Sequence, residues 1–258
     1  MVYRGLPTLE DPYRSLEDDL DLARRIHRSL MPKRLERSGV EIDSHCRAMR
    51  MLGGDYATVH ERAPGHVFLC ACDVTGHGLA AALLATRING FVRHALESVD
   101  HPCQVVESLN RFIVEHFGGL TIYATFFCLE LDFERAEIPY AGCAHPPPVL
   151  WRARESRCVR LQSRHTMVGL FPELPEGCHI DHIPFAPGDR LLLYTDGVIE
   201  TRDHKGEMFG IERLEKLLSN LDAEADTRQW LGRLFSRLDD FRHGVPHDDA
   251  LVVAVKFL

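Results

Sequence analysis

Three mostly apolar runs dominate the pattern of hydrophobic and polar positions along the chain. They cover residues 67–72, 190–195 and 250–255, and such runs are typical of strands buried on both faces of a sheet. Each run lies beside aspartate. Asp73 follows the first run and Asp196 the second, and an Asp-Asp pair at 248–249 comes just before the third.

The rest of the chain divides into helical stripes and alternating strands. Ser15 is a good N-cap, and Pro32 ends the apolar periodicity that follows it. Similar periodicity predicts further helices over 79–94, 102–116, 211–220 and 224–241. Strands are predicted over 40–46, 121–131, 137–141, 149–151 and 159–161. This order predicts an α+β fold with two largely antiparallel sheets and two pairs of helices.

The chain contains no solenoid repeat and no low-complexity linker. We expect residues 1–14 to form a flexible lead-in, because they contain two prolines and show no periodicity. Residues 15–38 are predicted to contain a helix of about four turns with a partly apolar face. That helix either packs on the domain or pairs with a second copy, as a switch or dimer helix. Residues 39–258 form the domain itself.

Composition excludes several classes of protein. The formal net charge of −8 argues against nucleic acid as a partner, because binding phosphate backbones needs a basic face. No apolar run approaches the roughly 18 residues of a membrane span, and the first residues lack a signal-peptide pattern. We therefore expect a cytoplasmic protein that does not associate with a membrane.

The eight cysteines are scattered, and none forms a C-x-x-C pair. Several lie inside apolar strand-like runs, as Cys70 and Cys72 do on one face of the same predicted strand. We interpret the cysteines as small buried hydrophobic residues in a reducing compartment. A disulfide framework or a zinc site is not predicted.

Asp55 and Asp73 are predicted to lie side by side. Gly53 and Gly54 precede Asp55 and mark a tight turn or bulge, and a short hairpin would join its strand to the strand that ends at Asp73. The simpler alternatives are a plain hairpin turn at the two glycines and a helix-capping role for Asp73.

A cluster of these aspartates would need cations. Two carboxylates ~4 Å apart at an effective dielectric constant of about 20 repel by roughly 4 kcal/mol. Oxygen ligands without an accompanying set of His and Cys favour Mg²⁺ or Mn²⁺ over zinc. Two such ions can hold a hydroxide and orient a phosphoryl group for in-line attack.

Five motifs in order then resemble a known family. They are Gly-Gly-Asp-Tyr at 53–56, Asp-Val-Thr-Gly-His-Gly at 73–78, Ala-His-Pro-Pro-Pro at 144–148, Tyr-Thr-Asp-Gly-Val-Ile-Glu at 194–200 and Asp-Asp at 248–249. Together they resemble the PPM-type, metal-dependent phosphatases of the protein phosphatase 2C superfamily. The bacterial SpoIIE-like branch, which includes the sigma-B regulators, is the most similar, over about residues 16–258.

The resemblance implies a sandwich of two antiparallel sheets flanked by helices, with two divalent cations at one end. Asp55 and Asp73 would hold the first ion together with the carbonyl of Val74, and Asp73 would bridge to the second. Asp196 and Asp248 would hold the second ion, with Asp249 as a close alternate for Asp248. The second shell would comprise Gly54, Gly76, His77, Gly197 and His247. His77 could equally pack or cap its turn.

The implied reaction is hydrolysis of phosphoserine or phosphothreonine on a small regulatory protein, in this branch a STAS-type anti-sigma-factor antagonist of a partner-switching pathway. One departure from the family is Thr58, which stands where a second aspartate is frequent. It keeps open an alternative, a catalytically impaired module that sequesters its partner. A metal-dependent nuclease is a third reading, which the negative charge does not favour.

Overall fold

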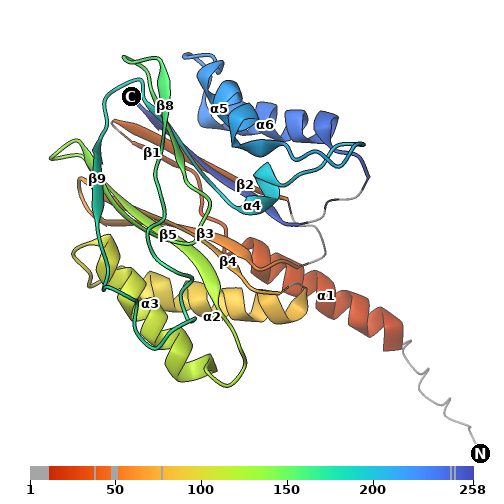
Figure 1. Cartoon of the computed structure of the whole chain (residues 1–258). Coiled ribbons are helices and arrows are strands. Elements are labelled where there is room, and N and C mark those ends of the chain that lie inside the picture. The colour runs from red at the N-terminus through yellow and green to blue at the C-terminus, as the bar shows by residue number, and fades with distance from the viewer. Residues whose placement is uncertain (1–11, 38, 48–51, 77, 245, 247) are drawn as a thin grey trace, which may run out of the picture.

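Two antiparallel sheets pack face to face in the computed structural model of the chain, with a helical layer outside each sheet (Figure 1). The structure describes residues 12–37, 39–47, 52–76, 78–244, 246 and 248–258, and the side chains from residue 18 onward. The predicted α-β-β-α sandwich is therefore confirmed. Its layers follow from strands that are apolar on both faces, since each sheet must be covered on both sides.

The six-stranded sheet has the order β1-β2-β11-β10-β7-β8. All its neighbouring strands pair antiparallel. In chain order the strands are β1 (Leu35–Arg37), β2 (Val40–Arg47), β7 (Val149–Arg152), β8 (Arg157–Arg160), β10 (Arg190–Tyr194) and β11 (Ala250–Phe257). The strand that comes latest in the chain, β11, lies in the middle of the sheet between β2 and β10.

The five-stranded sheet has the order β3-β4-β5-β6-β9 and is also antiparallel throughout. Its strands are β3 (Asp55–Ala63), β4 (His66–Val74), β5 (Ala124–Asp132), β6 (Glu137–Cys143) and β9 (Asp181–Pro184). The sequence pattern did not predict β1 or β9. Both are short strands with no fully buried position, so neither carries the apolar alternation of a core strand.

Two helix pairs cover the outer faces of the sheets. The helices α2 (Leu79–Ala95) and α3 (Pro102–Phe117) pack on the five-stranded sheet. The helices α5 (Gly210–Ser219) and α6 (Thr227–Phe241) pack on the six-stranded sheet. The α6 helix begins three residues later than predicted, because Asp226 forms a capping box with Gln229.

The alternation of side chains along β4 shows how three hydrophobic cores are built. Val67, Leu69 and Ala71 are buried between the sheets. The intervening residues, Phe68 and Cys70 among them, are buried under α2 and α3. A third core lies under α5 and α6. The unbroken apolar run of β4 is thus buried on both faces, as predicted.

The N-terminal helix, α1 (Pro12–Arg28), begins three residues before the predicted N-cap Ser15. In Figure 1 it runs outward beyond the end of the sandwich. His27 is buried, whereas Leu22 and Ile26 are 49% and 51% exposed. One face of α1 therefore contacts the domain, and its outer face presents apolar side chains to solvent.

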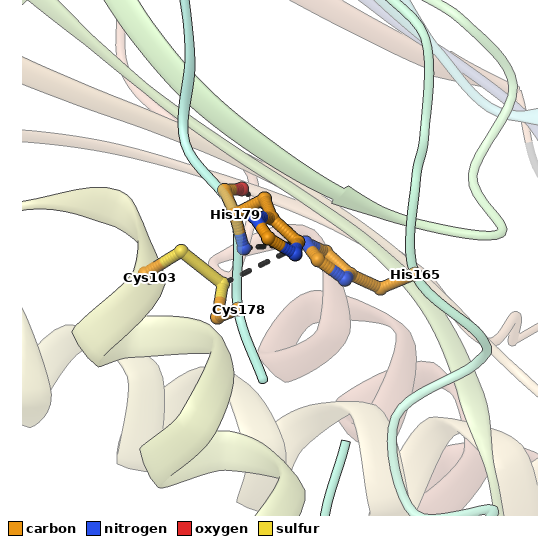
Figure 2. The surroundings of a disulfide bond; sticks show 4 residues. All are labelled: Cys103, His165, Cys178 and His179. Carbon is orange, nitrogen blue, oxygen red and sulfur yellow. Dashed lines mark hydrogen bonds between the residues drawn. A yellow bond between two sulfur atoms is a disulfide. The ribbon is translucent and has the colours of Figure 1, made fainter. Parts of the chain in front are cut away.

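A disulfide joins Cys103 at the start of α3 to Cys178, with Cα atoms 5.6 Å apart (Figure 2). The prediction that the cysteines form no disulfide is wrong for this pair. The other cysteines of the described chain are free thiols, four of them buried. The bond fastens the segment between β8 and β9 to α3. Beside it, the backbone N–H of His179 donates to Nε2 of His165 at 3.1 Å.

Candidate metal centre

Asp55 and Asp73 are cross-strand partners. Asp55 opens β3 and pairs in register with Asp73 near the end of β4, and a tight turn joins the two strands. Asp55 is 1% exposed and Asp73 is half-buried. Asp55 lies two positions before a residue of the inter-sheet core, and Asp73 lies two positions after another. Because alternate residues of a strand share a face, both carboxylates lie on the inter-sheet side of the five-stranded sheet. The predicted hairpin placement is confirmed.

Asp196 comes from the opposite sheet. It follows β10 and opens a single helical turn, α4 (Asp196–Ile199), which the sequence pattern did not predict. Gly197 lies against the start of β11, where a Cβ on this residue would be 1.9 Å from the carbonyl oxygen of Asp249. Only glycine fits this approach, which brings α4 and the Asp-Asp pair together.

The two aspartates before β11 differ in environment. Asp249 is buried, and its Oδ2 accepts a hydrogen bond from the backbone N–H of Gly54 at 3.1 Å. Asp248 is exposed, and its Oδ1 accepts from the Asp249 backbone N–H at 2.8 Å. A Cβ on Gly53 would lie 1.7 Å from Asp249 Oδ2. The two glycines therefore allow the backbone before β3 to contact Asp249 across the sandwich.

Thr195 is a site residue that the sequence reasoning missed. Its hydroxyl donates to Asp55 Oδ2 at 2.6 Å and accepts from the backbone N–H of Leu251 at 3.0 Å. It thereby links the two sheets at the candidate site. The only signal in the sequence was a hydroxyl residue directly before Asp196 at the end of an apolar strand.

The carboxylates strongly perturb one another. Burial, followed by the charges of Asp196 and Asp248, raises the pKa of Asp73 to about 7, although the Asp55 carboxyl within hydrogen-bonding reach lowers it in part. Burial first, and then the charge of Asp73, raises the pKa of Asp55 well above its usual range; Asp249 and Asp196 add to this effect. The five aspartates therefore share one electrostatic environment.

Asp196 provides the clearest indication of a missing positive charge. Burial, followed by the charges of Asp248 and Glu200, raises its pKa to about 6. Its Oδ1 is buried and has no hydrogen-bond partner among the described residues. A buried carboxylate oxygen of this kind is costly unless a cation or donor satisfies it. The donor set, which consists of oxygens alone, fits Mg²⁺ or Mn²⁺.

The arrangement is open in the described part of the chain. No three His, Cys, Asp or Glu side chains of the described residues stand close enough together to hold a single ion. The carboxylates thus shift one another's pKa values but do not form a closed set of metal ligands.

The other predicted positions are placed as follows. The Val74 carbonyl oxygen would lie 2.8 Å from a Cβ on Gly54, so it faces the backbone just before Asp55. Gly76 has a φ of 103° and open space around its Cα. His77 and His247 lie outside the described residues.

The structure places His145 in a buried position beside Thr125. Burial lowers its pKa to about 3, so the imidazole is neutral. The Thr125 hydroxyl lies 2.8 Å from its Nδ1. The Ser163 hydroxyl donates to its backbone carbonyl at 2.8 Å.

Comparison with solved structures defines the class of fold. The PP2C domain of SiaA from Pseudomonas aeruginosa superposes with a TM-score of 0.82, over 96% of this chain and 99% of that domain, at 18% identity. The structure of RsbX in complex with magnesium superposes with a TM-score of 0.64, over 88% of this chain and 99% of RsbX, at 12% identity. The fold is therefore that of the PP2C-type phosphatases.

The sequence assigns the family within that class. The family described as stage II sporulation protein E (SpoIIE) matches residues 63–258, which is more than half of the chain, and the chain belongs to it. Phosphoserine phosphatase RsbP of Bacillus subtilis is 29% identical over 188 residues, which cover 70% of this chain and 45% of RsbP. The chain thus spans less than half the length of that relative.

Among the described residues, no helix combines the length and the apolar character that a bilayer crossing requires.

Proposed function

We propose that the protein is a metal-dependent serine/threonine protein phosphatase. One observation carries the proposal most strongly. Aspartates from both sheets raise one another's pKa at one edge of the sandwich, and the buried Oδ1 of Asp196 has no partner among the described residues. Such a set is stable only when protonated or when cations neutralise it.

Two divalent cations would occupy the centre. Asp55, Asp73 and the Val74 carbonyl would hold the first, and Asp73 would also contact the second. Asp196 and Asp248 would hold the second ion, with Asp249 as the alternate to Asp248. When bound, the ions would lower the pKa of a water molecule and orient a phosphoryl oxygen. Support for Mg²⁺ or Mn²⁺ comes from the all-oxygen donors and from the magnesium complex of RsbX.

The surrounding groups hold these carboxylates in place. The Thr195 hydroxyl orients Asp55 from the opposite sheet, and the Gly54 N–H does the same for Asp249. Gly197 allows α4 to lie against the Asp249 carbonyl. The first two interactions join one sheet to the other, so the geometry of the centre depends on how the sheets pack.

The alternative, an impaired module that only sequesters a partner, rested on Thr58. Its hydroxyl accepts a hydrogen bond from Asn89 Nδ2 of α2 at 3.0 Å, and both residues are buried. Thr58 therefore faces the helical layer, whereas Asp55 faces the inter-sheet space. This placement supports an active enzyme, because a threonine at position 58 does not remove a carboxylate from the inter-sheet side, where Asp55 lies.

The proposed substrate is a phosphoserine or phosphothreonine on a small regulatory protein. The name of RsbP, phosphoserine phosphatase, supports the serine specificity. We propose a phosphorylated STAS-type anti-sigma-factor antagonist in the cytoplasm as the substrate. Dephosphorylation would let that protein capture its anti-sigma factor.

Residues 15–38 are proposed as a switch or dimer segment next to the phosphatase domain of residues 39–258. His27 of α1 is buried close enough to the backbone of Gly53 and to Asp249 for both to raise its pKa, although burial lowers it overall. Movement of α1 would therefore displace the backbone that contacts Asp249. The exposed Leu22 and Ile26 would suit pairing with a second copy.

The test is hydrolysis of a phosphoserine peptide with Mn²⁺ or Mg²⁺, with and without EDTA. We expect metal-dependent turnover, and a loss of about a hundredfold or more in Asp196→Asn, the scale of removing one group that stabilises the transition state. The control is Asp203→Asn, a partly exposed turn carboxylate a few residues further along. Absence of turnover with either ion in folded protein would favour the sequestering module.

A further inference from the structure

A small cavity opens beside the candidate metal centre along α4. Its volume is about 100 Å³, and Gly197 and Asp248 form part of its lining, together with apolar side chains of α6 such as Phe235. Whole small-molecule sites have volumes of roughly 300–1,000 Å³. This cavity can therefore accept one functional group of a larger ligand, but not a complete small molecule.

Three arginines from separate elements line the cavity. Arg47 ends β2, Arg202 follows α4, and Arg242 is the C-cap residue of α6. The acidic residues of the lining are Glu200, which is exposed, and Asp248, which the proposed function assigns to an ion. In a chain of net charge −8, three guanidinium groups thus line one small cavity next to the proposed reaction centre.

The partners of these arginines leave positive charge unneutralised. Arg47 and Arg242 both pair with the same carboxylate, Asp239. Arg202 donates through Nη1 to the neutral carbonyl of Gly206 at 2.9 Å, and no carboxylate of the described residues lies within ion-pair distance of it. One carboxylate therefore pairs with two guanidinium groups and the third, Arg202, pairs with none, which leaves capacity for a further anion.

We propose that this cavity binds a carboxylate side chain of the substrate, an Asp or Glu close in sequence to the phosphorylated residue. The proposal rests on the proposed phosphatase function, because it assumes that the phosphate of the substrate lies on the Asp248 side of the cavity. Gly197 of α4 and Arg202, which follows α4, both line the cavity, whereas Asp196 does not. Guanidinium groups bind carboxylates through paired, charge-assisted hydrogen bonds, which gives both affinity and selectivity.

The experiment compares phosphoserine peptides that carry glutamates on the N-terminal side, glutamates on the C-terminal side, or glutamines at the same positions. For the wild type, one of the two acidic peptides should show a kcat/KM at least about tenfold above that of the glutamine peptide. That factor corresponds to about 1.4 kcal/mol, as expected for one charge-assisted contact. Arg202→Gln and Arg242→Gln should each reduce the ratio severalfold.

Two further variants separate the cavity from the overall field of the protein. Arg237→Gln removes the same charge from α6 at a residue that lines a different groove, between α5 and α6. It should leave the ratio unchanged. Asp239→Asn should raise the ratio, because it releases Arg47 and Arg242 from their shared carboxylate. An equal fall in Arg237→Gln and Arg202→Gln would overturn the proposal in favour of long-range attraction.

A binding measurement keeps the proposal testable if the enzyme proves inactive. Fluorescence anisotropy of the acidic and glutamine peptides would be measured with Asp196→Asn, alone and combined with Arg202→Gln. Preference for the acidic peptide that is lost in the double variant supports the cavity. Equal affinity for acidic and neutral peptides overturns it, whatever the turnover assay shows. Failure of the proposed function alone would appear as no hydrolysis of any peptide by the wild type.

Discussion

Replacing Asp73 by asparagine should stabilise the metal-free protein while it removes metal binding. Asparagine has almost the same shape as aspartate but cannot ionise. In the wild type at pH 8, Asp73 is ionised, and its charged form is destabilised by burial and by the charges of Asp196 and Asp248. The substitution removes that repulsion.

The magnitude follows from the pKa. Burial and the neighbouring carboxylates raise the pKa of Asp73 from 3.8 to about 7. At about 1.4 kcal/mol per pKa unit, ionising this group in the folded protein costs up to about 4 kcal/mol. Asp73 and Asp55 titrate together, so part of this free energy belongs to Asp55. We therefore expect Asp73→Asn to raise the free energy of unfolding by about 2–4 kcal/mol at pH 8. At pH 5 the group is protonated in the folded protein but already ionised in the unfolded chain, so the gain should fall to less than half of its value at pH 8.

The assay is urea unfolding in EDTA at pH 5 and pH 8, followed by thermal unfolding with added Mg²⁺. A gain of 2–4 kcal/mol corresponds to a rise in Tm of roughly 4–16 °C for a domain of this size. With Mg²⁺ the difference between the two proteins should shrink. The wild type should gain stability by mass action, about 2.7 kcal/mol at a hundredfold excess over Kd, and Asp73→Asn should gain much less.

The matched control is Asp189→Asn. Asp189 is 1% exposed, and its carboxylate accepts from the backbone N–H groups of Ala153 and Ala186 and lies 3.3 Å from Nε of Arg152. Its replacement should destabilise the protein at both pH values, because it breaks satisfied interactions. A destabilising effect of Asp73→Asn at pH 8, or a gain that does not change with pH, would refute the convergence of the carboxylates.

Three further outcomes are expected. Gly197→Ala places a Cβ 1.9 Å from the Asp249 carbonyl oxygen, so it should cost about 1–3 kcal/mol in urea unfolding and weaken Mg²⁺ binding measured by calorimetry. Thr195→Val keeps the shape but leaves Asp55 Oδ2 without its donor; it should cost about 1–3 kcal/mol, and an unchanged unfolding midpoint would contradict the cross-sheet role. The stability that protonated Asp73 contributes is fully present below pH 3.8 and is lost as pH rises through about 7, so metal-free wild type should have a higher Tm at pH 5 than at pH 8.

The strands that carry the site were predictable from local pattern. The apolar run of β4, the glycines before Asp55 and the short turn between the strands are enough to place Asp55 opposite Asp73. Each signal acts over a few residues, where sterics and burial decide the conformation. The layer architecture followed in the same way, because strands buried on both faces need a covering layer on each side.

Contacts between distant segments were not predictable from one sequence. Cys103 and Cys178 are 75 residues apart, and nothing in their spacing shows that a loop returns to α3. The bond from Thr195 to Asp55 spans 140 residues and depends on how the two sheets pack. The edge strand β9 (Asp181–Pro184) is half exposed, so its sequence lacks the apolar alternation that marks a core strand.

The position of β11 has a consequence for the order of folding. This strand occupies the centre of its sheet between β2 and β10, yet both neighbours precede it along the chain. During synthesis β2 and β10 therefore emerge with no strand between them, and the sheet closes only when β11 inserts. Such non-local pairing is slow. The insertion also delivers Asp248 and Asp249, so the acidic centre is assembled in the same step that completes the sandwich.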